Sequence, residues 1–203
     1  MKDKLKFKKL LNEYRSLESE FAYNSEVLRE YGETFECTYL KWCEENGVDL
    51  DALSKEKTKK VAIPHSQNTT EDKGRVEFEA KQTKHKELFR SVAKKMHPDK
   101  LKPEDPREEE YTSAFQKATS AMNEGQWGDL FDVIDKYEIE VSDYGEANIS
   151  LQSDIVRMEN KLKNQKSTYV WHLQNCDDNP NCKDMVIQAY LRQVFGWNGK
   201  EEI

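Results

Sequence analysis

The sequence predicts an essentially all-α protein built from narrow helical layers. Of its residues 36% are hydrophobic and 35% are charged, and the mean hydropathy is -0.98, so the interior is thin relative to the surface. Apolar side chains recur at steps of three and four, the spacing of one helix face. Few runs of β-branched residues alternate with polar ones, which leaves strands without support. The length of 203 residues allows one compact domain, or a small domain with extended helices.

The first element is a helix of about 30 residues, or ~45 Å at 1.5 Å per residue. Its seam is Phe7, Leu10, Tyr14, Leu17, Phe21, Asn24, Leu28, Tyr31 and Phe35. Such a heptad pattern is typical of a helix that packs against another helix, and a polar residue such as Asn24 can fix its register. After Phe35 we expect a further helical piece, a turn at Asn46-Gly47 and a short helix begun by Asp49.

The central part of the chain predicts three helices. Residues 61–72 lack any period and read as a linker or loop. A helix then runs from Lys73 to Met96, where the proline at 98 disfavours a helical His97. After a loop with two prolines, Asp105 is a plausible cap for a helix that starts near Arg107. The segment QWGDLFDVIDKY begins the third helix.

A second seam lies toward the C-terminus, and Gly145 could break its helix early. It consists of Ile134, Tyr137, Val141, Tyr144, Asn148, Leu151, Ile155, Met158, Leu162, Gln165 and Tyr169. We expect the two seams to pack against each other, antiparallel if within one chain, as a coiled-coil stalk. Pairing of each seam with its copy in another subunit is the alternative, because heptads do not say whose interface they form. A loop at 177–181 and a last helix through Phe195 complete the chain.

Charge and cysteine content narrow the function classes. A net charge of -7 and a pI near 5.3 make a nucleic-acid partner unlikely. No apolar run approaches the ~20 residues needed to span a bilayer, and the N-terminus is not a secretory signal, so we expect a cytoplasmic protein without a membrane partner. Cys37 and Cys43, and Cys176 and Cys182, are each six apart, unlike the CxxC pairs of zinc sites. We expect reduced thiols, with a zinc or disulfide staple at CDDNPNC as the alternative.

The stretch AKKMHPDKLKPEDP at 93–106 carries the strongest functional signal. Before it, Phe89, Val92, Ala93 and Met96 form an apolar stripe of one helix. Another side of the same helix presents Lys86, Arg90, Lys94 and Lys95. Such a cationic face is usually only solvated, but it could guide an acidic partner by long-range attraction.

This arrangement resembles the J domain of DnaJ-type co-chaperones, whose two antiparallel helices are joined by a loop with His-Pro-Asp. ELFRSVAKKMHPDK is similar to the family's second helix and loop, and YTSAFQKATSAMNEG to its third helix. The resemblance covers about residues 84–124. The first helix of the family, its glycine/phenylalanine-rich region and its zinc repeats are missing, so we expect Trp127, Leu130 and Phe131 to cover the hairpin instead.

The resemblance implies a binding function without a cofactor or a bound metal. The basic face and Lys100 would dock on a DnaK-type chaperone, and His97, Pro98 and Asp99 would act on the contacts that restrain its ATP hydrolysis. Pro98 would fix the backbone, Asp99 would supply a carboxylate for an arginine, and His97 would donate a hydrogen bond or shape the loop. The implied division is 1–60 for N-terminal coiled-coil helices, 61–72 for a linker, 73–140 for the J-domain-like region and 141–203 for the C-terminal coiled-coil and terminal helices.

Catalysis and a structural scaffold are the two other function classes. Catalysis lacks support, because no nucleophile motif, phosphate loop or HExxH accompanies His97 and Asp99. A structural scaffold or interaction protein is the main alternative, with the hairpin as a degenerate remnant. The stalk could hold a client protein, and an oligomer is possible.

Overall fold

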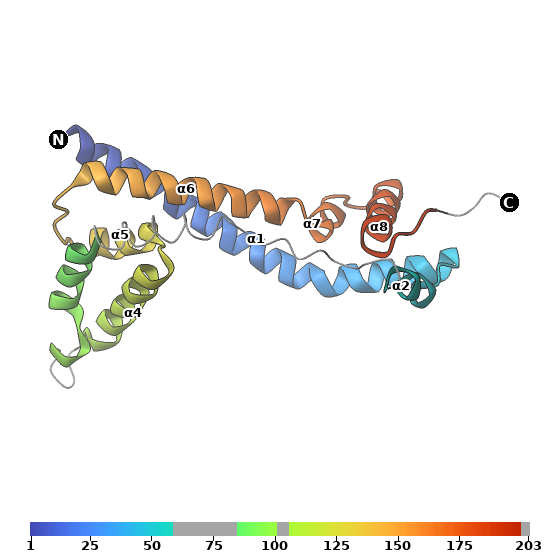
Figure 1. Cartoon of the computed structure of the whole chain (residues 1–203), viewed down its shortest axis with the longest axis horizontal. Helices are drawn as coiled ribbons and strands as arrows, with labels where there is room; N and C mark the ends of the chain where they lie inside the picture. Colours follow the sequence, from blue (N-terminus) through green and yellow to red (C-terminus); the bar gives the residue numbers. More distant parts are fainter. Residues whose placement is uncertain (59–84, 101–105, 200–203) are drawn as a thin grey trace. The chain divides into compact units, whose positions relative to one another are not determined.

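The computed structural model describes residues 1–58, 85–100 and 106–199, and within these ranges it contains helices and no strand. The all-α prediction is confirmed for this part of the chain. The predicted linker 61–72, the start of the helix at Lys73 and the cap Asp105 lie outside the described residues. In chain order the elements are α1 (Lys2–Asn46), α2 (Leu50–Thr58), a helical segment at 85–96, the 3-10 turn η1 (Pro98–Lys100), α4 (Glu108–Glu124), α5 (Trp127–Lys136), α6 (Tyr144–Lys166), α7 (Tyr169–Gln174) and α8 (Pro180–Phe195) (Figure 1).

The chain forms two compact units, and each takes residues from both ends of the sequence. Unit 1 consists of Met1–Ser19 and Gln67–Glu159, and unit 2 of Glu20–Ser66 and Asn160–Ile203. Unit 1 contains the helical segment 85–96 with α4 and α5, and unit 2 contains α2, α7 and α8.

Helix α1 is longer than the sequence suggested, because the predicted seam helix and the piece after Phe35 form one helix. It ends where Gly47 adopts a positive φ of 64°, a conformation that glycine tolerates without strain. The N–H of Val48 then donates to the Cys43 carbonyl at 2.8 Å and closes the end of the helix. The prediction of a turn at Asn46-Gly47 is confirmed. Asp49 begins α2 as expected, since its carboxylate accepts the Ala52 N–H at 3.0 Å.

The second seam is divided between α5 and α6, and the break is not at Gly145. Helix α5 ends at Lys136, where Ile139 N–H donates to the Ile134 carbonyl at 2.9 Å and Glu138 takes a positive φ of 53°. Gly145 instead lies in the first turn of α6. The Asp143 carboxylate accepts the Gly145 and Glu146 N–H groups at 2.8 and 3.1 Å. The helix starts here because this cap satisfies its first amides, a signal that outweighs the low helix propensity of glycine.

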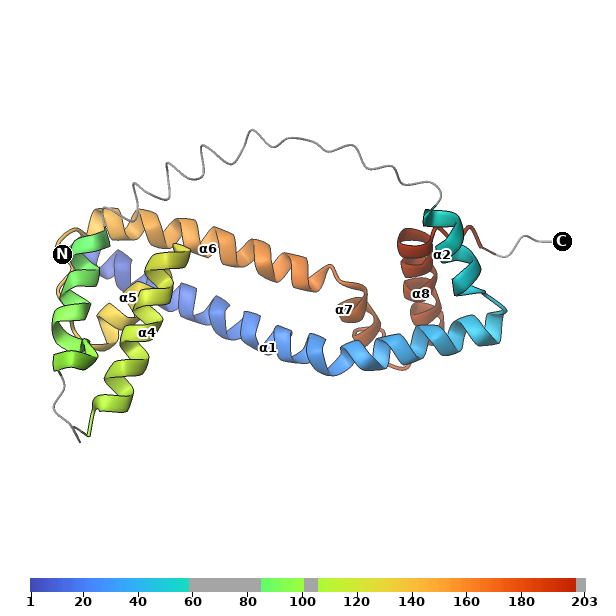
Figure 2. The same ribbon diagram turned by 60° about the horizontal axis from the view of Figure 1, so that its bottom comes forward.

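Helices α1 and α6 run in the same direction, so the prediction of an antiparallel pair is wrong. In unit 1 Asn148 donates to the Asp3 carbonyl at 3.2 Å. Further along both helices, Asp154 accepts the Gly128 N–H, and Gly128 lies against the Tyr14 ring. Residue numbers thus rise together on α1 and α6. The physical reason is that the hairpin and α5 return the chain to the start of α1 before α6 begins, whereas a short connection would have reversed it (Figure 2).

The core of unit 1 lies among α1, α5 and α6. Phe7 of α1 contacts Phe131 of α5 and Tyr144 of α6 edge to face, with ring centroids 5.5 and 5.4 Å apart. In unit 1, burial confirms the seam residues Phe7, Leu10, Tyr14, Asn148, Leu151, Ile155 and Met158, whereas Tyr31 farther along the first seam is exposed. Trp127, Leu130 and Phe131 are also buried, as predicted for the residues that cover the hairpin.

Unit 2 has its own core. Phe35 and Cys43 of α1 pack with Leu173 of α7 and with Ile187 and Leu191 of α8. Aromatic rings surround this cluster: Tyr39, Trp42, Tyr169, Tyr190, Phe195 and Trp197. The indole N–H of Trp42 donates to the Asp184 carboxylate at 2.9 Å and joins α1 to α8. The prediction of a last helix through Phe195 is confirmed.

The loop between α7 and α8 contains a disulfide between Cys176 and Cys182, so the expectation of reduced thiols is wrong for this pair. The Cα atoms are 5.5 Å apart, which is within the usual range for such a bridge. The sequence did not predict this disulfide, because side chains six residues apart on one helix point in different directions. Here Asn179 caps α8 by accepting the Cys182 N–H, and the loop turns one cysteine toward the other. Cys37 and Cys43 are free thiols.

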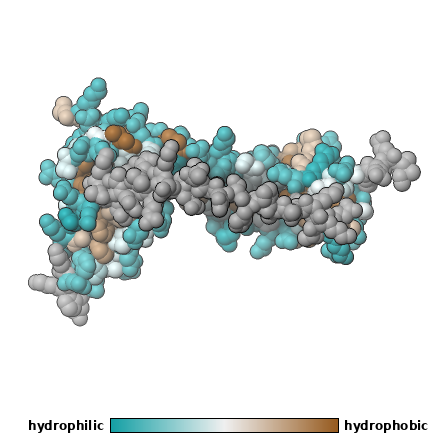
Figure 3. Space-filling model, in the orientation of Figure 1, coloured by the Kyte–Doolittle hydropathy of each residue, from teal (hydrophilic) through white to brown (hydrophobic). Residues whose placement is uncertain are grey.

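The space-filling view is mainly hydrophilic where it is coloured, with small separate apolar patches (Figure 3). This agrees with the low apolar fraction of the sequence. Among the described residues of unit 1, the exposed large apolar side chains are Met1, Leu5, Ile149 and Val156.

Candidate functional site

The His97-Pro98-Asp99 loop lies at the end of the helical segment 85–96. His97 N–H still donates to the Ala93 carbonyl at 3.0 Å, and Pro98, which has no N–H, begins η1. The Asp99 side chain is 87% exposed and that of His97 is 39% exposed. The loop therefore presents its carboxylate to solvent, where an approaching protein can reach it.

The imidazole of His97 contacts both α4 and the backbone of its own loop. Its ring meets the Phe115 ring edge to face at 5.1 Å, and Phe115 belongs to α4. The Asp99 N–H donates to His97 Nδ1 at 3.3 Å, and an Asp99 carboxylate oxygen lies 3.5 Å from the same nitrogen. His97 Nδ1 is thus the acceptor for the backbone of its own loop. Of the two roles considered for His97, this geometry favours shaping of the loop.

Half of the predicted apolar stripe is buried: Val92 and Met96 are fully inside, while Phe89 and Ala93 are only partly buried. Leu88, which was not predicted as part of the stripe, is also buried, and Phe89 stacks on Phe115 with centroids 6.0 Å apart. On the facing helix the buried residues are Ala114, Ala118, Ala121 and Met122. The two helices that flank the loop thus share one apolar interior, which fixes the loop's direction.

Sequence reasoning missed His85, which is only 2% exposed. One ring nitrogen lies 2.8 Å from the Ser150 hydroxyl of α6, and the ring packs on Trp127 and Phe131 at 4.8 and 5.2 Å. The signal was available, because His85 stands three and four positions before Leu88 and Phe89 on the apolar stripe. Because histidine was counted as a polar residue, His85 was not assigned to that stripe.

The predicted cationic face is present on the outer side of the same helical segment. Lys86, Arg90, Lys94 and Lys95 are all exposed. Lys95 differs from the others because its ammonium donates to the Tyr137 carbonyl at 2.6 Å, at the end of α5. Lys100 belongs to η1, and its side chain lies outside the described part of the structure.

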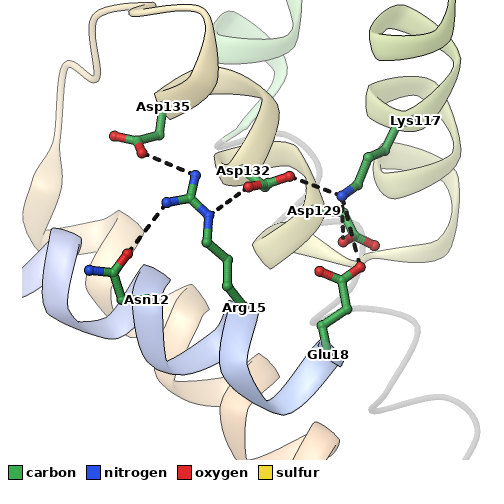
Figure 4. A network of polar contacts seen from close by, with 7 residues as sticks. All are labelled: Asn12, Arg15, Glu18, Lys117, Asp129, Asp132 and Asp135. Carbon is green, nitrogen blue, oxygen red and sulfur yellow. Dashed lines mark hydrogen bonds and ion pairs between the residues drawn. The ribbon is translucent and has the colours of Figure 1, made fainter. Parts of the chain in front are cut away.

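A network of charges attaches the hairpin to α1 (Figure 4). Arg15 of α1 donates to Asp132 at 2.7 Å and to Asp135 at 3.1 Å, both on α5. Lys117 of α4 donates to the other oxygen of Asp132 at 3.0 Å. It also lies within 3.5 Å of Asp129 and 3.8 Å of Glu18. Sequence reasoning did not find this network, because α1 is distant in sequence from α4 and α5.

The pKa values in this network follow from burial and pairing. Burial raises the pKa of Asp132, but hydrogen bonds from Arg15 and Lys117 outweigh it, so the pKa is lowered overall. Burial and the neighbouring Asp129 raise the pKa of Glu18, and Lys117 opposes them only in part. At neutral pH the network thus holds α1, α4 and α5 together, with the ionised Asp132 carboxylate at its centre.

Comparison with known proteins adds no assignment: no protein family, no curated protein and no solved structure matches this chain. Among the described residues, no group of three histidine, cysteine or acidic side chains is placed to hold a metal ion. None of the helices in the described ranges has both the length and the apolar character needed to cross a membrane.

Proposed function

We propose that this protein is a J-domain-type co-chaperone that binds a DnaK-type chaperone and stimulates its ATPase. The observation that carries the proposal is the exposed Asp99 carboxylate, held outward by the contact of its own backbone with His97. A turn that only ended a helix would need Pro98 alone. Here the histidine is seated on Phe115 and the acid is left free of the interior, an arrangement suited to a partner's guanidinium.

The cationic face supports the same proposal. Lys86, Arg90 and Lys94 are exposed on the helical segment that ends in the loop, on a chain of net charge -7. An acidic chaperone surface would be attracted to this face over distances of about one Debye length, roughly 8 Å at physiological salt. The loop would then be delivered in a fixed orientation, and the chemistry would remain the partner's.

The first test measures single-turnover ATP hydrolysis by a bacterial DnaK with wild type and with Asp99→Asn. We expect stimulation by wild type and little or none by the variant. Glu109→Gln is the matched control, because it removes an exposed carboxylate from α4 of the same hairpin. No stimulation by wild type, or equal stimulation by wild type and Asp99→Asn, defeats the proposal.

A second test examines the cationic face. The charge reversal Arg90→Glu should raise the concentration of protein needed for half-maximal stimulation, and added salt should reduce the difference from wild type. A variant that loses only the maximal rate, with no salt dependence, would argue against docking through this face.

We propose in addition that α1 and α6 form a coiled-coil stalk and that this stalk holds a client protein. A scaffold role is the second candidate, and the separate core of unit 2 favours it because the loop does not require that core. Solution mass discriminates between them. A large, stable oligomer that does not respond to DnaK would favour the scaffold.

A further inference from the structure

We propose that Tyr137 is a positioning residue that holds together the two stems of the His97–Asp99 loop. Tyr137 caps α5, and three of its groups contact the hairpin. Its carbonyl accepts the Lys95 ammonium at 2.6 Å, and its hydroxyl donates to the Glu110 carboxylate at 2.9 Å. Its ring meets Tyr111 edge to face at 5.4 Å. These residues, with Lys136, are here called the Tyr137 clasp.

The positions of these contacts explain why the clasp bears on the loop. Lys95 belongs to the last turn before His97, and Glu110 belongs to the first turn of α4 after the loop. A single residue from a third helix thus contacts the chain on both sides of the loop. Since the direction of Asp99 depends on how far apart the two stems lie, a bridge between them limits how the carboxylate can move.

The clasp acts outside the buried interior of the hairpin. Val92 and Met96 pack inside, whereas Lys95, Glu110 and Lys136 are exposed. Glu110 also accepts from Lys136 at 3.0 Å. Hydrogen bonds from Lys136 and Tyr137 lower the pKa of Glu110, which keeps this acceptor ionised at neutral pH. The core gives the helices their contact, and the clasp fixes their separation at the loop end.

The clasp also divides the cationic face into two roles. Lys95 is engaged with Tyr137, so its part is to position the loop. Arg90 and Lys86 lie five and nine positions earlier and serve for docking. This division rests on the proposed function, whereas the clasp itself does not.

The test uses the full-length double variant Lys95→Met/Tyr137→Phe, which removes the ammonium and the hydroxyl but keeps both side-chain shapes. Lys163→Met/Tyr144→Phe in α6 is the matched control, because it makes the same two chemical changes outside the clasp and the cationic face. Amide hydrogen exchange is measured at 97–100 and 108–111, together with the thermal midpoint. Opening of the loop should become about thirtyfold more favourable in the clasp variant, the factor expected for two lost hydrogen bonds, and should be unchanged in the control.

Stimulation of DnaK gives the second readout. The clasp variant should reduce the maximal stimulation and leave the half-saturating concentration unchanged, because docking is intact but the loop is misdirected. Unchanged exchange in the loop overturns the clasp, and so does faster exchange spread evenly over unit 1. If the variant loosens the loop while wild type fails to stimulate DnaK, the clasp stands and the proposed function falls.

Discussion

The ring of Tyr14 in α1 lies directly against Gly128 in α5, so that a Cβ on this glycine would be 2.4 Å from the ring. Tyr14 is 2% exposed, and Asp154 of α6 accepts the Gly128 N–H at 2.8 Å. The glycine therefore allows three helices to approach one another at a single point. Burial and nearby carboxylates, Asp129 first among them, raise the pKa of Tyr14, so its hydroxyl stays protonated.

Gly128→Ala should destabilise unit 1, because the new methyl group can be accommodated only if the ring or α5 moves. Overpacking of this kind costs about 1–3 kcal/mol. Urea unfolding measures the loss. Gly32→Ala in α1 is the control, because nothing lies within 4 Å of its new Cβ, and it should be neutral or stabilising. Equal effects of the two substitutions would contradict the close approach.

Asp132→Asn should destabilise the protein at neutral pH by about 1.5–3 kcal/mol, the range for hydrogen bonds to charged groups. It should also flatten the fall of stability in acid. The folded-state pKa of Asp132 is lowered, so its contribution is present above the unfolded value of about 3.9 and is lost as pH falls through the folded value. Thermal midpoints between pH 7 and acid measure this.

The disulfide predicts a difference between oxidised and reduced protein. Cleavage by a dithiol, or Cys182→Ser, should destabilise unit 2 by about 2 kcal/mol, given the short loop that the bridge closes. Cys37→Ser, which removes an exposed free thiol, should change little. Thiol titration after denaturation without reductant should find Cys37 and Cys43 alone. Reaction of all the cysteines in that experiment would show that the bridge is absent.

Trp42→Phe should weaken the contact between α1 and α8 and so lower the free energy of unfolding. The variant keeps an aromatic ring in the cluster but loses the 2.9 Å hydrogen bond to Asp184, a loss of about 1.5–3 kcal/mol. Asp184→Asn should be milder, because an amide oxygen still accepts the indole N–H. Urea unfolding followed by circular dichroism compares the two, and a larger loss in Asp184→Asn would argue against this bond.

The amino-acid sequence by itself determined the helices, and it did so where local signals are strong. The period of apolar residues predicted the seams of α1 and α6, and Gly47 and Asp49 predicted the turn into α2. The exposed loop at 97–99 follows from Pro98 and from the stripe that ends at Met96. Each of these features depends on residues within a few positions of one another.

Tertiary structure decided the rest, because it concerns which distant faces meet. A heptad seam specifies burial but not direction, so only the return of the chain beside Phe7 makes α1 and α6 parallel. The charges around Asp132 and the contacts of Tyr137 with both loop stems are likewise contacts between segments that are far apart in the sequence. Their energies depend on distance in space, and spacing along the chain does not report that distance.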